Sequence, residues 1–168
     1  MHRSGQLKLK TGPRAGTFNI AGPNLIGPLP LRDGGFLRVT VSLVLANTAD
    51  GIRMKVEEAS YQYQLDETND SWVFRYDYER NPPNHYPAGH LHIRGTLHQE
   101  CLPRGDVQQL EDVHFPILRC SIEAVIRLLA EQFQVRCNTP RSYWRPVLAL
   151  SEDLFLAMAH RPLSGPAK

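Results

Sequence analysis

The stretch WVFRYDYERNPPNHYPAGHLHIRGTL, residues 72–97, decides the fold. Residues 72–79 alternate aromatic with mostly polar side chains, and residues 90–97 alternate polar with aliphatic ones. Alternation with a period of two is typical of a β-strand that buries one face. The proline-rich segment between the two runs cannot join a hydrogen-bond ladder, so it predicts a loop that reverses the chain. The stretch therefore predicts two antiparallel strands whose apolar faces meet one core.

The second face of this hairpin is expected to gather the polar residues of both strands. Successive side chains of a strand point to opposite faces, so polar residues that alternate with core residues share one surface. They are Arg75 and Asp77 from the first strand and His90, His92 and Arg94 from the second, with His98 in phase beyond them and His85 in the loop. A β-bulge between Arg75 and Asp77, or between His90 and His92, would separate them.

Three interpretations of this surface are open, and the first is a solvated sheet face on which histidine is merely tolerated. The second is a metal-free acid–base site, because imidazole both takes and gives a proton near neutral pH. One histidine would deprotonate a ribose 2′-hydroxyl and another would protonate the leaving oxygen. Arg75 or Arg94 would hold the phosphate, and Asp77 would fix a histidine tautomer.

The third interpretation is a metal site. The H-x-H pattern of His90 and His92 offers two zinc ligands on one strand, and Asp77, His85 or His98 offers a third. The pattern does not specify its partners by spacing. His114, in the segment DVHFP, is expected to be structural or solvated rather than part of the site.

The composition predicts a folded protein that needs neither disulfides nor a structural zinc to be stable. Apolar residues make up 42% of the 168 residues and charged residues 21%, which is enough apolar material for a core. The net charge of +2 is too small to indicate a broad nucleic-acid-binding face, but it leaves room for a small RNA site. Three cysteines without C-x-x-C spacing predict neither a disulfide framework nor a zinc knuckle. With no signal-peptide pattern and no membrane-spanning run, we expect a cytoplasmic protein that does not bind membranes.

The rest of the chain predicts an α+β fold. Further strands are expected over residues 36–46 and 53–66, the latter as one strand or two. A helix is expected after Ser121 as N-cap, and a second after Ser151, with a loop around Pro140 and Pro146. The predicted fold is an antiparallel β-meander of four to five strands with one or two helices packed on one face. The predicted division is a Gly/Pro-rich basic arm or tail with little regular structure at residues 1–35, a single α+β domain at 36–160, and a C-terminal tail at 161–168.

Three segments in this order resemble the TumE-type toxins of bacterial and archaeal toxin–antitoxin pairs. They are RYD at 75–77, NHYPAGHLH at 84–92 and SIEAVIRLLAEQF at 121–133, and the resemblance covers roughly residues 36–135. It implies a small α+β protein encoded beside a DNA-binding antitoxin and acting on RNA or another nucleotide target. The candidate site residues that the resemblance implies are Arg75, Asp77, His85, His90 and His92.

Pattern and resemblance together predict a toxin-like, metal-independent ribonuclease. The predicted catalytic residues are His90, His92, Asp77, Arg75 and His85, and the predicted substrate-binding residues are Arg94 and His98. No cofactor is expected, with a divalent metal such as zinc as the alternative. The expected partners are a cognate antitoxin or another protein, and RNA. The alternative function is a non-enzymatic module that docks a partner protein through its sheet and N-terminal arm.

Overall fold

The computed structural model describes residues 6–11, 15–21, 27–32, 34–48, 51–82, 85–95 and 109–159. The strands are β1 (Gln6–Thr11), β2 (Ala15–Ala21), β3 (Leu29–Pro30), β4 (Phe36–Thr48), β5 (Gly51–Gln64), β6 (Trp72–Glu79), β7 (Gly89–Ile93) and β8 (Phe115–Pro116). The helices are the short 3-10 helix η2 (Leu110–Asp112), α1 (Ile122–Glu131) and α2 (Arg141–Ala159).

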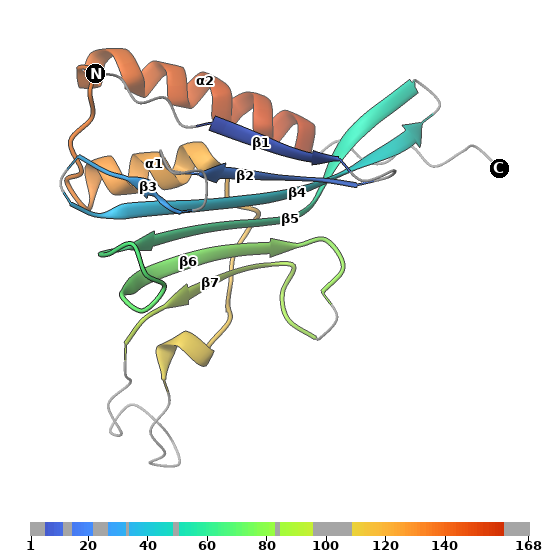
Figure 1. Cartoon of the computed structure of the whole chain (residues 1–168). Helices are drawn as coiled ribbons and strands as arrows, with labels where there is room; N and C mark the ends of the chain where they lie inside the picture. Colours follow the sequence, from blue (N-terminus) through green and yellow to red (C-terminus); the bar gives the residue numbers. More distant parts are fainter. Residues whose placement is uncertain are drawn as a thin grey trace.

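The strands of the described residues form one antiparallel sheet in the order β1-β2-β4-β5-β6-β7-β8, with β3 pairing with one end of β4. Helices α1 and α2 lie on the same side of this sheet (Figure 1). The predicted α+β class, the meander from β4 to β7 and the helices on one face are confirmed. The sheet is wider than four to five strands because β1, β2 and the two-residue strands β3 and β8 also join it.

The hairpin of β6 and β7 has the register that the alternation predicts. On one face Phe74 pairs with Ile93 and Tyr76 with Leu91, and the register is continuous from Phe74 to Tyr78. Register shifts occur after Ser42 in the β4–β5 pair and between Tyr63 and Gln64 in the β5–β6 pair. The second shift skips Val73 of β6, which precedes the polar positions of that strand. The polar positions of β6 and β7 therefore share the face that points away from the helices.

The core lies between the sheet and α1. Strands β4, β5 and β6 contribute Leu37, Val39, Ala59, Tyr61, Tyr63 and Phe74, and α1 contributes Val125 and Leu129. Helix α1 begins as expected, because Ser121 is its N-cap and the Ser121 Oγ accepts a hydrogen bond from the backbone N–H of Ala124 at 3.1 Å. This packing fixes β6 against its neighbours, and β6 in turn positions the polar face.

Helix α2 is longer than expected, and the prediction of a loop around Pro140 and Pro146 is wrong. The carbonyl of Pro140 accepts hydrogen bonds from the N–H groups of Tyr143 and Trp144, so the helix starts directly after this proline. Pro146 removes only one donor, and the helix continues through it. Ser151 is not a cap: within the helix, its hydroxyl donates to Glu123 of α1 at 2.5 Å.

The N-terminal segment differs from the expectation of little regular structure. Strands β1 and β2 pair with each other, and β2 pairs with β4 from Ala15 opposite Val44 to Ile20 opposite Val39. The sequence QLKLKT of β1 alternates with a period of two, a signal that the high glycine and proline content of the segment obscured. The domain limits at residues 35 and 160 stay predictions, and residues 161–168 lie outside the described residues.

Candidate functional site

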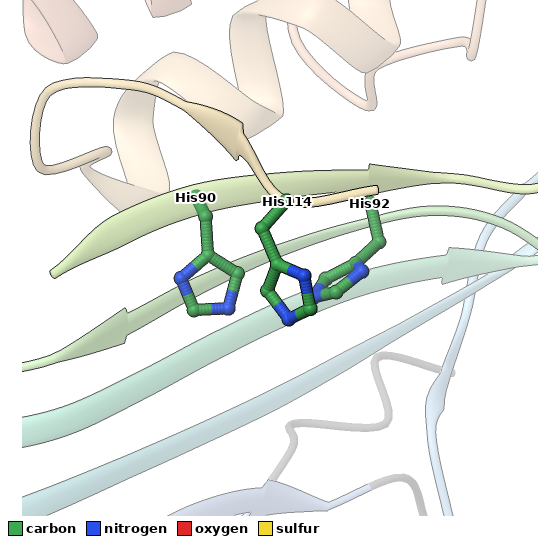
Figure 2. Close-up of side chains that lie close together, drawn as sticks. All are labelled: His90, His92 and His114. Atoms are coloured by element: carbon green, nitrogen blue, oxygen red, sulfur yellow. The ribbon is translucent and has the colours of Figure 1, made fainter. Parts of the chain in front are cut away.

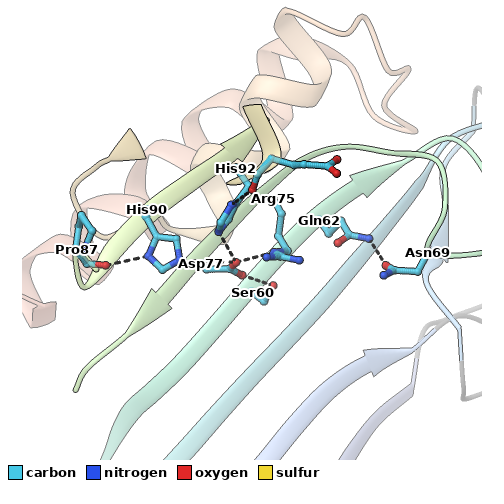
Figure 3. A network of polar contacts seen from close by, with 9 residues as sticks. Ser60, Gln62, Asn69, Arg75, Asp77, Pro87, His90 and His92 are labelled. Carbon is cyan, nitrogen blue, oxygen red and sulfur yellow. Dashed lines mark hydrogen bonds and ion pairs between the residues drawn. The ribbon is translucent and has the colours of Figure 1, made fainter. Parts of the chain in front are cut away.

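The carboxylate of Asp77 is the fixed centre of the polar face (Figure 3). Arg75, two residues earlier on β6, donates from Nε to Asp77 Oδ2 at 2.6 Å. Ser60 lies opposite Asp77 on β5 and donates from Oγ to Oδ1, also at 2.6 Å. Each carboxylate oxygen therefore has a donor, and the orientation of the group is set from two strands.

His90 and His92 are buried, which separates this face from an ordinary solvated one. Their exposed fractions are 3% and 4%. The Nδ1 of His90 lies 2.9 Å from the carbonyl oxygen of Pro87, and the Nδ1 of His92 lies 2.8 Å from that of Glu111. A carbonyl oxygen only accepts, so both Nδ1 atoms carry the proton and, in the neutral rings, both Nε2 atoms carry a lone pair.

Two backbone carbonyls therefore set the tautomers of His90 and His92. The acid–base interpretation had assigned this role to Asp77. Asp77 lies on the other side of the rings, with Oδ2 at 3.6 Å from His92 Nε2 and 4.0 Å from His90 Nε2. Burial lowers the pKa of His92 below its ordinary value, and the charges of Arg75 and His114 act in the same direction. The hydrogen bond to Glu111 and the charge of Asp77 oppose this shift without cancelling it.

A third imidazole, that of His114, completes the cluster. Strand β8 pairs with β7, with Phe115 opposite Leu91, and continuing this register places His114 opposite His92. The ring centroid of His114 lies 4.5 Å from that of His92 and 4.8 Å from that of His90, and Figure 2 shows the three rings together. Tyr86 stacks on the His114 ring with centroids 3.8 Å apart and planes 6° from parallel.

The sequence interpretation missed this role of His114. The available signal was weak: His114 alternates with the apolar residues Val113 and Phe115, but the strand that results is only two residues long. Its neighbours on the site come from a segment more than twenty positions earlier in the chain, which no local pattern indicates.

The other predicted residues lie apart from the cluster or outside the described residues. Arg94 is exposed just beyond β7, and its charge helps to lower the pKa of Asp66, although hydrogen bonds from Ser71 and Thr68 are the larger causes. His85 is exposed in the loop between β6 and β7. His98 lies outside the described residues.

A buried amide network borders the site on the β5 side. Gln62 donates from Nε2 to Gln64 Oε1 at 2.9 Å and to Asn69 Oδ1 at 2.7 Å. Gln64 in turn donates to the carbonyl oxygens of Asp66 and Thr68 at 2.7 and 2.5 Å. These bonds fasten the β5–β6 loop beside Arg75, because Gln62 pairs with Arg75 across the sheet.

Comparison with protein families places the chain among toxins. The family model described as Toxin TumE matches residues 29–128, a range that includes β3 to β8, most of α1 and all three histidines of the cluster. The chain belongs to the TumE toxin family. No curated protein and no solved structure matches it.

Family membership implies an antitoxin as partner. None of the helices within the described residues has the length and apolar character needed to cross a membrane. The chemistry available at the polar face is that of three imidazoles, one carboxylate and one guanidinium, which suits proton transfer, phosphate binding or cation binding.

Proposed function

We propose that this toxin cleaves the phosphodiester backbone of RNA at the cluster of Arg75, Asp77, His90 and His92. The observation that supports it best is the pair of buried imidazoles whose Nε2 atoms face a carboxylate that is itself bound to a guanidinium. Burying a polar group costs free energy unless the group is hydrogen-bonded, so several buried polar groups at one place favour a functional site over a solvated face.

The roles follow from chemistry. RNA cleavage needs a group that takes the proton of a ribose 2′-hydroxyl, a group that protonates the leaving oxygen, and a cation for the phosphate. The sequence predicts a metal-independent reaction in which His90 and His92 transfer these protons. Arg75 is half-buried and uses Nε for Asp77, so the terminal nitrogens of its guanidinium are the part that meets a phosphate.

The remaining predicted residues are proposed at the approach to the cluster. Arg94 and His85 are exposed, which suits contacts with an RNA strand better than chemistry in the buried centre. His98 is kept as a proposed substrate-binding residue on the sequence alone.

The test combines growth arrest on expression with RNA cleavage by the purified chain. We expect His90→Ala and His92→Ala to lose both activities, compared in preparations shown to be folded by their melting temperature. Arg75→Gln should slow cleavage, whereas Arg32→Gln, which removes an exposed charge ahead of β4, should not. Growth arrest that survives both histidine substitutions would contradict the assignment of the site.

A second candidate, the docking of a partner protein, is favoured by the outer face of α2. Tyr143, Val147, Leu150 and Leu154 recur at helical spacing, and each is more than half exposed. The surface that this suggests is α2 rather than the sheet and N-terminal arm expected from the sequence. Replacing Leu150 and Leu154 by glutamate should weaken antitoxin binding and leave RNA cleavage unchanged. If the double variant binds the antitoxin as wild type does, α2 is not the docking surface.

A further inference from the structure

The geometry points to a divalent metal site formed by the ring nitrogens of His90, His92 and His114. Asp77 lies beside it and supplies either the fourth ligand, an oxygen, or a hydrogen-bond partner for metal-bound water. This inference deepens the proposed function and rests on it for the role of the cation in RNA cleavage, although binding itself is measured without RNA. It replaces the metal-independent reaction that the sequence predicts.

The three histidines converge without being neighbours in the chain. Each offers one ring nitrogen, and these atoms all lie within 4.8 Å of one another. Zinc–nitrogen bonds of about 2.0–2.1 Å place tetrahedral ligand atoms about 3.3 Å apart. Closing onto a cation therefore requires each nitrogen to move inward by less than about 1 Å, which small side-chain rotations supply.

The free nitrogens are the ones that a cation needs. His90 and His92 each give the Nδ1–H to a backbone carbonyl, so each neutral ring presents Nε2 to the cluster. Metal-binding histidines almost always donate their other ring N–H to a carbonyl or a carboxylate in this way. The ring of His114 is held by its stack on Tyr86.

The electrostatics of the cluster also favour a cation. The Nε2 lone pairs of His92 and His90 face the Oδ2 of Asp77 at 3.6 and 4.0 Å, and this oxygen already accepts a hydrogen bond from Arg75 Nε. Acceptors that face one another in a buried place repel unless something positive lies between them. One proton satisfies the lone pair of one ring, whereas one cation binds a lone pair from each of the three rings.

The set of ligands selects the class of metal. Three imidazoles and one carboxylate suit zinc or a similar transition-metal dication, whereas magnesium and calcium prefer sites built of oxygen. Three protein nitrogens also leave a coordination position for water, and such a cation makes bound water a stronger acid. The imidazoles would then serve as ligands, and the reaction class proposed above would stay the same.

The experiment measures metal in the full chain, purified on a tag without histidine and without a chelator. We expect about one zinc per chain by elemental analysis, and replacement of zinc by cobalt(II) should give the intense visible absorption of tetrahedral coordination. His90→Gln and His114→Gln should weaken zinc binding by more than about 100-fold, beyond the usual effect of losing an outer-shell partner. His85→Gln, an exposed histidine outside the cluster, is the matched control and should bind as wild type does.

The wild-type measurement decides the matter even if the substituted chains fail to fold. A wild-type protein that binds neither zinc nor cobalt in tetrahedral form overturns the inference, as does zinc binding that His114→Gln leaves unchanged in a folded protein. RNA cleavage by metal-free protein would overturn the role of the cation in cleavage while leaving the proposed function intact. Stoichiometric zinc in a protein inert toward RNA would support the site and contradict the proposed function.

Discussion

At the scale of single residues, burial controls the ionisation of Tyr61 on the helix side of the sheet. Burial raises the pKa of Tyr61 from 10.0 to about 12, with smaller contributions from neighbouring charges. The pKa of Tyr61 is higher in the folded than in the unfolded protein, so the neutral side chain contributes its full stabilisation below pH 10. This contribution is lost as the pH rises toward 12. We expect the free energy of unfolding to fall by about 2–3 kcal/mol over this range.

Urea denaturation at a series of alkaline pH values checks this. Tyr61→Phe should flatten the fall above pH 10, whereas Tyr143→Phe, at an exposed position of α2, should not. Cys120 adds a loss of stability that begins at a lower pH, because burial raises the pKa of its thiol from 9.0 to about 11. Stability that is equally steep in wild type and Tyr61→Phe would contradict the role of Tyr61.

The carboxylate of Asp77 gives a second prediction at this scale. In metal-free protein, Asp77→Asn places an amide where Arg75 and Ser60 both donate, so at least one donor loses its acceptor. We expect a loss of about 1–3 kcal/mol in the free energy of unfolding. Asp70→Asn, in the exposed β5–β6 loop, is the control and should change it by less than about 0.5 kcal/mol. Equal effects of the two substitutions would mean that the bonds to Asp77 contribute nothing.

Part of the site followed from the sequence because period-two geometry is local. Alternation along β6 and β7 was enough to place Arg75, Asp77, His90 and His92 on one face. The burial of the two histidines and the partners of their Nδ1 atoms could not be predicted from local alternation. The carbonyl of Glu111, for example, comes from a segment 19 positions after His92. His114 arrives with that same segment and was missed for the same reason.

At the scale of elements, α1 depends on its N-cap. The Ser121 hydroxyl accepts from the N–H of Ala124 and donates to Glu152 of α2 at 3.3 Å, so it joins the two helices. We expect Ser121→Ala to lower the free energy of unfolding by about 1–2 kcal/mol in urea denaturation. Ser142→Ala, at an exposed helical position, should change it by no more than about 0.5 kcal/mol. A Ser121→Ala protein as stable as wild type would show that the cap is dispensable.

Helix α2 shows why a proline misleads sequence interpretation. In the sequence, Pro146 indicates the end of a helix. In the structure, it removes only the hydrogen bond to the carbonyl of Ser142 and adds a local clash. We expect Pro146→Ala to raise the stability by about 1–3 kcal/mol, because it restores the missing donor. Pro140→Ala, just before the helix, should have little effect. A Pro146→Ala protein that is no more stable in urea would mean that the helix has adapted to the proline.

At the scale of the whole molecule, the sequence predicted the middle of the sheet better than its ends. Strands β4 to β7 are consecutive and joined by short connections, so their pairing follows from local alternation and turns. The pairing of β2 with β4 crosses a glycine- and proline-rich segment, and the contact of β8 with β7 spans more than twenty residues. Such non-local pairing depends on the rest of the fold, which composition alone does not encode.

This pairing gives a prediction that separates an arm from a part of the domain. Strand β2 covers β4 from Val39 to Val44, and deleting residues 1–21 would leave those backbone groups unpaired on an apolar strand. Unpaired edges of this kind recruit other chains, so we expect the truncated protein to self-associate in size-exclusion chromatography with light scattering. Deleting residues 161–168 is the control and should leave the elution of the full chain unchanged. A truncated protein that elutes as a smaller version of the full chain, at the same melting temperature, would show that residues 1–21 are an arm after all.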